Sequence, residues 1–391
     1  MASRPPDNSL YESGGPDTLF DANGQFRFKN ELFWGDNLLA EIHYEALAGG
    51  GDTRRKQQAL ARVNPRLLPL GLSGGSAVND DRRLLNLTGV ISQDDAFIWY
   101  HRLDRLYLAW RGRQGTIKLG RQALTWGHGF LFNPLDLFNP FSPTDFVRDY
   151  KVGDDMALVQ TAWDGVDLQL LCIPRREPVS GDLRWDESSL AGKLHLTLGT
   201  TELDLMLAQH YGDRVAGLGL VGYLGEAAWR MDATWTALDD SDFSSGYLSL
   251  AANLDYSWVW WGKNFYGWAE FFLNGLGRSN YVQALADPDL VHRLQRGELF
   301  SLGKIYFDAE VKVELHPLLN LHFTAIVNLQ DPSALFQPRL AWDLSQNTQL
   351  ILGINLYGGG QETEFGGFKL PGTTLEVAPS DSAYCWLTYY F

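Results

Sequence analysis

The chain has 391 residues, of which 47 are acidic and 32 basic, so its formal net charge is −15. This acidity excludes the basic face that a nucleic-acid-binding protein needs, and no stretch reaches the ~20 consecutive apolar residues of a membrane-spanning helix. Either two or three soluble domains or one large β-barrel remain possible. The 13% of aromatic residues and the 40 glycines suit a barrel, in which apolar and polar residues alternate.

The N-terminal residues 1–19 contain no apolar core of a signal peptide. If the protein is exported, we expect the sequence to be a mature form from which the signal peptide is absent. Residues 1–19 would then be an N-terminal segment, possibly incomplete. No linker divides the remainder, so a single domain is predicted over residues 20–391.

Period-two alternation begins near residue 20 and returns up to the C-terminus. In residues 307–315, for example, Asp308, Glu310, Lys312 and Glu314 alternate with apolar residues. Because side chains in a strand change face at every step, such segments predict strands with one polar and one apolar face. Seventeen strands are predicted, over residues 20–34, 37–47, 103–112, 115–122, 154–163, 166–174, 189–198, 201–211, 214–222, 225–236, 246–259, 263–275, 300–314, 318–329, 334–343, 347–357 and 382–391.

Three features favour a transmembrane barrel over a soluble β-sandwich, which also alternates. The predicted strands often reach ~10 residues, the length that crosses a bilayer, whereas globular strands average ~5–6. Aromatic residues gather near strand ends, as in Trp258–Trp261. Tight and long connections alternate, as periplasmic turns and outer loops do. We therefore predict an all-β fold: a single transmembrane antiparallel up-and-down β-barrel of about 16–18 strands.

The strand number is the open point of this prediction. Bacterial single-chain barrels have an even number of strands, so one strand has been missed or one is false. A missed strand within residues 8–19 or 53–101 would give 18, which we favour, and a false one would give 16. Long outer loops are predicted at about residues 48–101, 123–153, 276–299 and 358–381.

Residues 123–153, after the fourth predicted strand, form the most distinctive of these loops. The loop is rich in aromatic residues, and its Asn-Pro pairs at 133–134 and 139–140 favour extended or turn geometry. So many aromatic residues do not suit a loop surrounded by water. We therefore predict that the loop folds into the barrel, packs on its wall and narrows the bore.

Charged and aromatic residues in or near this loop are candidates for the pore constriction. Opposed charges across a constriction create a transverse field that orders water and selects ions. The alternative is that the same charges only pin the loop by salt bridges and select nothing. The candidates are Arg105, Lys118, Arg121, Trp126, Asp136, Asp145, Arg148 and Asp149.

A set of short motifs in this region resembles a known family. The motifs are the strand Asp104–Leu108, Gly120-Arg-Gln122, Trp126-Gly127, the NPxDxFNP run 133–140 and the run 148–154. Together they are similar to Gram-negative outer-membrane porin-like barrels, loosely to alginate-export-type porins. The motif set covers about 50 residues, and the rest agrees only in pattern. The resemblance implies a barrel with a passive or selective pore and leaves the solute open.

The C-terminal residues 383–391 alternate strictly and end on an aromatic residue. Soluble proteins rarely end on their most apolar strand, since termini are usually polar and frayed. The tail resembles the assembly signal that the bacterial barrel-assembly machinery reads, in which Leu387, Tyr389 and Phe391 would be the recognised residues. The bacterial outer membrane is the expected location.

Motifs for catalysis, metals or cofactors are missing from the chain. The histidines lack HExxH or comparable spacing, no GxSxG occurs, and no CxxCH is present. Cys172 and Cys385 stand at alternating apolar positions without a CxxC pair. We therefore expect no enzyme activity, no metal and no cofactor, with an outer-membrane lipase or protease as a minor alternative.

Two functions fit these expectations best. The first is a porin that passes small polar or charged solutes by diffusion through a water-filled lumen narrowed by loop 123–153. The alternative is a sheath that holds a periplasmic or lumenal protein partner, such as a multihaem cytochrome in an electron conduit or an export partner; a barrel of about 18 strands is wide enough for that. The expected partners are the lipid bilayer with lipopolysaccharide, the barrel-assembly machinery and small solutes, but not nucleic acid.

Overall fold

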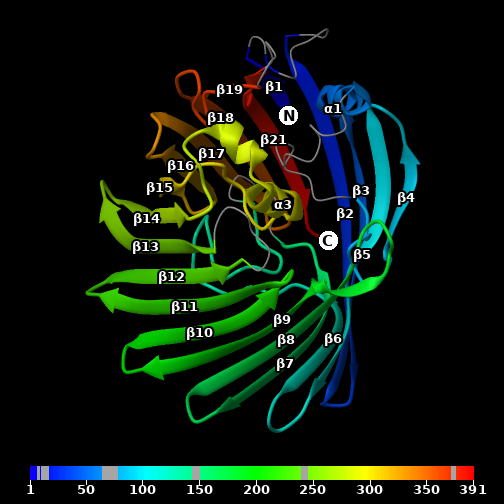
Figure 1. The fold of residues 1–391 in the computed structure, drawn as a ribbon. Coiled ribbons are helices and arrows are strands. Elements are labelled where there is room, and N and C mark those ends of the chain that lie inside the picture. Colours follow the sequence, from blue (N-terminus) through cyan, green and yellow to red (C-terminus); the bar gives the residue numbers. More distant parts are fainter. Residues whose placement is uncertain (7–8, 10–16, 64–77, 143–149, 239–244, 371–375) are drawn as a thin grey trace.

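The structure, a computed structural model, describes residues 1–6, 9, 17–63, 78–142, 150–238, 245–370 and 376–391. Within these ranges an antiparallel sheet closes into a barrel (Figure 1). Eighteen strands form the ring: β1 (Ala2–Arg4), β2 (Leu19–Trp34), β3 (Leu38–Gly51), β5 (Phe97–Arg111), β6 (Thr116–Gln122), β7 (Asp154–Trp163), β8 (Val166–Arg176), β9 (Leu183–Leu198), β10 (Thr201–His210), β11 (Asp213–Leu224), β12 (Ala227–Ala237), β13 (Gly246–Trp260), β14 (Lys263–Asn274), β15 (Ile305–His316), β16 (Leu319–Asn328), β17 (Ser333–Ser345), β18 (Thr348–Gly358) and β21 (Asp381–Tyr389).

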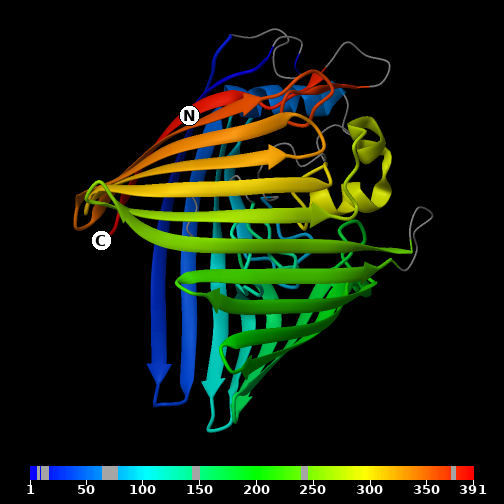
Figure 2. The ribbon, with the colours of Figure 1, turned by 90° about the vertical axis from the view of Figure 1, so that its left-hand side faces the viewer.

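The remaining elements lie in the long connections at one end of the barrel (Figure 2). They are α1 (Asp52–Val63), α2 (Tyr281–Ala286), α3 (Pro288–Arg296), β4 (Thr88–Gln93), β19 (Phe368–Lys369) and β20 (Glu376–Val377). Strand β4 pairs with β5 alone, and β19 pairs with β20 as a separate ribbon. In the described ranges, no helix has the length and apolar character needed to cross a membrane.

The alternation of the sequence places apolar side chains on the outside of the ring. Leu207, Trp235, Phe307 and Phe323 are exposed there, while their chain neighbours Met206, Thr234, Asp308 and Thr324 are buried inside. In water this arrangement would expose the large apolar side chains to solvent, which is unfavourable. In a bilayer it matches an apolar outer face and a polar interior.

Tight turns join the strands at the other end of the barrel. Two of them pair a residue of positive φ with a glycine of positive φ: Asp164 (42°) with Gly165 (79°), and Trp261 (48°) with Gly262 (67°). Two consecutive positive φ angles are the geometry of a type I′ turn, whose twist matches that of a hairpin. A glycine at the second position adopts it without steric cost.

The predicted fold class is confirmed, since the barrel is all-β, antiparallel and closed with 18 strands. All seventeen predicted strands are present, with ends that shift by up to six residues. The strand that completes the ring is β1, which pairs with both β2 and β21. It lies before both ranges, 8–19 and 53–101, that were predicted to contain the missed strand. Three residues are too few to show alternation. The range 53–101 contains the additional strand β4.

Candidate functional site: a loop that bridges the lumen

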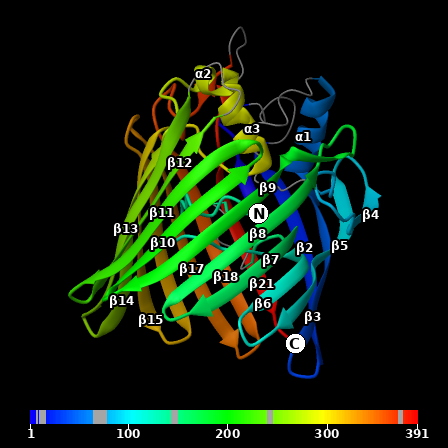
Figure 3. The ribbon, with the colours of Figure 1, turned by 60° about the horizontal axis from the view of Figure 1, so that its bottom comes forward.

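The loop between β6 and β7 runs through the inside of the barrel (Figure 3). It leaves the wall at Gln122, contacts β12, β13 and β14, and returns to β7 at Asp154. Strand β14 stands eight strands after β6 in the ring of 18, so the loop reaches almost the opposite wall. We name residues 123–142 and 150–153 the bridging loop; residues 143–149 between them lie outside the described residues.

The far end of the bridging loop is held by one carboxylate. Glu270 on β14 accepts backbone N–H bonds from Phe130 (2.7 Å), Leu131 (3.1 Å) and Phe132 (2.9 Å), and Asn253 donates to it at 3.1 Å. Three successive N–H groups that point at one anion form a strong charge-assisted contact. Glu270 thus satisfies the backbone donors of the loop tip.

A second carboxylate, Asp232 on β12, holds the residue before the tip. It accepts the backbone N–H of His128 at 2.5 Å, and its other oxygen lies 2.9 Å from Nδ1 of the same histidine. On the neighbouring part of the wall, Asp204 of β10 bonds to Lys193 at 2.9 Å and to the ring of His195 at 2.7 Å. The far wall therefore binds the loop through both its backbone and its side chains.

Aromatic and aliphatic side chains complete the contact with the wall. Phe130 stacks on Trp268 with ring centroids 4.9 Å apart, and Phe132 stacks on Phe272 at 4.2 Å. The indole N–H of Trp126 donates to Gln169 at 2.7 Å. Loop and wall residues form one apolar cluster, made of Leu124, Trp126, Leu135, Phe138, Met156, Leu158, Leu171, Ile173, Ala191, Met206 and Val215.

Two glycines of β11 make room for Leu135, which is fully buried. A Cβ atom at Gly217 would come within 2.5 Å of a methyl carbon of Leu135, and one at Gly219 within 2.9 Å. Contacts this short do not occur between real side chains. The glycines of β11 therefore let the loop pack directly on the wall.

The near end of the bridging loop is fastened to β5. Asp104 accepts the backbone N–H of Gly153 at 3.0 Å and bonds from Arg27 (2.9 Å) and Arg105 (2.5 Å). Arg105 also donates to the backbone carbonyl of Lys151 at 2.7 Å. Strands β2 and β5 and the returning loop are thus joined through one buried aspartate.

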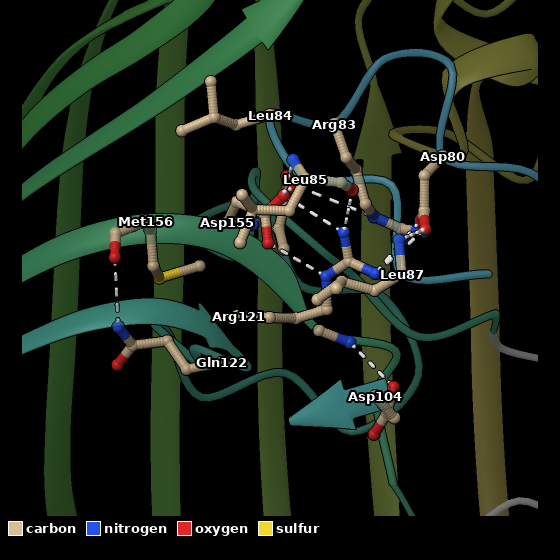
Figure 4. Close-up of polar contacts among 12 residues, drawn as sticks. Asp80, Arg83, Leu84, Leu85, Leu87, Asp104, Arg121, Gln122, Asp155 and Met156 are labelled. Atoms are coloured by element: carbon tan, nitrogen blue, oxygen red, sulfur yellow. Dashed lines mark hydrogen bonds and ion pairs between the residues drawn. The ribbon is translucent and has the colours of Figure 1, made fainter. Parts of the chain in front are cut away.

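Arg121 at the end of β6 forms a second attachment (Figure 4). Its Nε and one terminal nitrogen donate to the two oxygens of Asp155, at 2.9 and 3.0 Å, while the other terminal nitrogen lies 3.1 Å from Asp80. It also donates to the carbonyl of Leu85 at 2.6 Å. The segment before β4 is in this way tied to β6 and β7, and Arg83 adds a 2.7 Å bond to Asp80.

The structure places the predicted constriction residues mostly in buried, paired positions. Arg105 and Arg121 are ion-paired as described, Asp136 pairs with Lys151, and Trp126 is buried against Phe138. Lys118 is half-buried, with its ammonium 5.7 Å from the ring centre of Tyr107. The candidates Asp145, Arg148 and Asp149 lie outside the described residues.

The predicted assembly signal lies at the outer face of the last strand. Leu387, Tyr389 and Phe391 are exposed, and the Phe391 ring stacks on Phe26 of β2 with centroids 5.8 Å apart. Recognition of these residues by the assembly machinery stays a prediction.

Sequence reasoning missed Glu270 and Asp232 as residues of the site, although both stand on the polar faces of predicted strands.

The connection between β14 and β15 forms a helical cover over part of the barrel mouth at the end with the long connections (Figure 1). Arg293 on α3 pairs with Asp213 and donates to the Tyr247 hydroxyl at 3.1 Å. Glu298, after α3, lies 3.3 Å from Arg296 and 3.8 Å from Arg293. Burial alone would raise the pKa of the Glu298 carboxyl, but His210, Arg296 and Arg293 outweigh it and lower the pKa from 4.5 to about 2.

This lowered pKa predicts an acid-sensitive cover. A carboxyl whose folded pKa is below its ordinary value stabilises the fold above pH 4.5, and this contribution, at most about 3 kcal/mol, is lost as the pH falls toward 2. We expect pepsin to cut within residues 288–298 at pH 2 but not at pH 4. Glu298→Gln should allow cutting at pH 4, and equal cutting of the native chain at both values would contradict the prediction.

Ligating side chains do not gather into a metal site here: the described residues contain no group of three or more His, Cys, Asp or Glu placed to hold a metal ion. The arrangement instead offers a polar interior crossed by a fixed loop. Its chemistry is that of ion pairs and hydrogen bonds between the loop and the barrel wall.

Comparison with known proteins shows the fold but no family. No protein-family model and no curated protein matches the chain. Solved structures do match: a BenF-like porin from Pseudomonas fluorescens Pf-5 (10% identity, TM-score 0.52, 100% of this chain and 96% of that one), Pseudomonas aeruginosa OpdL (12%, 0.51, 95% and 92%) and Pseudomonas aeruginosa OccK9, or OpdG (11%, 0.55, 100% and 94%).

At these identities the similarity is one of fold. The chain has the 18-stranded barrel fold of Gram-negative outer-membrane porins. The closer resemblance to alginate-export-type porins finds no support, because no family model matches.

Proposed function

We propose that the protein is a channel of the bacterial outer membrane, through which small polar or charged solutes diffuse along a lumen narrowed by the bridging loop. The observation that carries the proposal is this loop, which is bonded to β5 on one side and to Glu270 and Asp232 on the other. A fixed loop across a polar lumen restricts what passes without doing chemistry. The fold, shared with porins, supports this conclusion and supports the absence of catalysis.

The charges near the loop contribute to this function mainly by holding it. Arg105, Arg121 and Asp136 each bond to a buried partner, which leaves them little freedom to meet a solute. These contacts therefore support the role of holding the loop by salt bridges better than the role of selecting ions across a constriction. Lys118 forms no ion pair within the described residues and is the candidate left to face a solute.

Reconstitution into a planar bilayer tests the proposal. We expect stepwise conductance from the purified protein, with an amplitude that rises with salt concentration because ions in the lumen carry the current. Heat-dependent mobility in SDS gels would verify that the barrel is folded. Folded, inserted protein that leaves the bilayer electrically silent would overturn the proposal.

The sheath function is the second candidate, and the geometry does not favour it. The bridging loop and its apolar cluster occupy the β7–β11 side of the lumen, which a threaded protein partner would need. A native pull-down with a haem absorption band near the Soret position would revive this alternative. We expect the pull-down to contain no such band.

A further inference from the structure

The lumen wall formed by β12 to β15 carries an excess of carboxylates. Register and alternation place six of them on the inner face, against only two basic side chains, Arg230 and Lys312. The six are Asp232, Asp255, Glu270, Asp308, Glu310 and Glu314. This part of the wall therefore has a negative formal charge. Arg230 compensates Asp255 at 2.5 Å, and Arg339 of β17 lies 3.8 Å from Glu310.

The opposite wall is balanced by contrast. Arg102 on β5 pairs with Glu45 at 2.6 Å, Arg121 on β6 with Asp155 at 2.9 Å, and Arg175 on β8 with Asp154 at 2.9 Å. Each of these bonds cancels a positive charge within the wall. Arg102, Arg121 and Arg175 are thus not free to balance the acidic wall, although Lys118 on β6 forms no ion pair in the described part of the chain. Within the described residues the β12–β15 wall therefore keeps a negative formal charge.

One carboxylate in the acidic wall lacks a partner. Asp308 on β15 is 0% exposed, and neither of its oxygens has a hydrogen-bond partner within the described part of the chain. Glu270 is its direct neighbour across the β14–β15 pair. No Lys, Arg or His among the described residues forms an ion pair with either.

Two adjacent carboxylates without a cation are costly to bury. An isolated buried charge costs several kcal/mol even after relaxation, and directly opposed like charges on neighbouring strands destabilise a sheet. Glu270 is compensated by the N–H groups of the loop tip, but these donors are used up by it. This cost is avoided in one of two ways, by a proton on Asp308 or by a cation beside it, and the described side chains supply no such cation.

We propose that the β12–β15 wall is a cation-binding surface with Asp308 at its deepest position, and that it makes the channel pass monovalent cations and cationic solutes in preference to anions. The inference rests on the proposed channel function and deepens it by naming the class of solute. A small cation drawn from the lumen compensates Asp308 and Glu270 together. A field of one sign between low-dielectric walls raises the local concentration of the opposite ion.

Reversal potentials in a potassium chloride gradient measure this preference directly. We expect the reconstituted native protein to show a cation-to-anion permeability ratio above one. Asp308→Asn keeps the shape of the side chain and removes one charge near the passage, so the ratio should fall roughly twofold to threefold. A native ratio at or below one, or an Asp308→Asn ratio equal to the native value, would overturn the inference.

Two further variants keep the test sharp. Asp164→Asn removes a charge in an exposed tight turn that joins β7 and β8 and should leave the ratio unchanged. If Asp308→Asn does not insert, Glu314→Gln, at a half-buried lumen position, should lower the ratio instead, and an unchanged ratio there counts against the inference. A silent bilayer removes the channel function itself, whereas conductance without cation preference removes only the inference.

Discussion

Replacing Glu270 by alanine is expected to release the tip of the bridging loop and to enlarge the channel. The carboxylate accepts three successive backbone N–H groups of residues 130–132. Its removal leaves these donors without partners at a buried position, which costs on the order of 3 kcal/mol or more in loop docking. We expect a larger single-channel conductance and more current noise than in the native protein.

The matched control for this variant is Glu226→Ala, in a tight turn between β11 and β12, where the carboxylate accepts a hydrogen bond from the hydroxyl of Tyr256. It should conduct like the native protein. Glu270→Gln offers a milder change, since one oxygen still accepts while the new amide group faces the loop donors. The conductance of Glu270→Gln should fall between those of Glu226→Ala and Glu270→Ala. Native conductance and noise in Glu270→Ala would show that the loop is held without this carboxylate.

Replacing Arg121 by methionine is expected to cause the largest loss of stability. Arg121 is 1% exposed and bonds to Asp155, Asp80 and the carbonyl of Leu85. Methionine fills similar volume, but it removes the cation paired with Asp155 and leaves Asp80 with Arg83. Removing one partner of a buried pair costs about 3–5 kcal/mol. Urea unfolding in lipid vesicles, followed by tryptophan fluorescence, measures this loss.

An exposed ion pair in the same protein provides the control. Arg184 pairs with Asp186, and both side chains are more than half exposed. Surface pairs contribute about 0–1 kcal/mol, so Arg184→Met should unfold at nearly the native urea concentration. Arg121→Lys keeps the charge but not the two-pronged contact with Asp155, and we expect an intermediate loss. An Arg121→Met barrel within 1 kcal/mol of the native one would show that the cluster around Asp80 is dispensable; the threshold is about the value of a surface pair.

The strands of this protein could be read from the chain because alternation is a local property. A period of two follows from the backbone geometry of each strand. Residues 307–315 show it without reference to any partner, and all such segments became strands. The inward-folding loop could also be foreseen, since aromatic residues such as Trp126 and Phe132 need a wall to pack on, and both are buried in the structure.

The roles of the charged residues at the site could be predicted less well from the sequence, for a physical reason. Arg105 and Arg121 were considered as pore-lining groups, but each is bonded within the protein, to Asp104 and Asp155. The residues that hold the loop tip, Glu270 and Asp232, stand 140 and 104 positions from their partners Phe130 and His128. No spacing rule along the chain connects residues so far apart.

The amino-acid sequence by itself determined the barrel, its outward apolar face and the loop that turns inward. Each of these features depends on the pattern of polar and apolar residues within short segments. Only the tertiary structure decided which charges are paired within the protein, and that buried Asp308 has no hydrogen-bond partner among the residues the structure describes. It also decided that the three residues of β1 complete the ring. The pairing of the charges and the closure of the ring both depend on which strands become neighbours, because closure brings together side chains that are far apart along the chain.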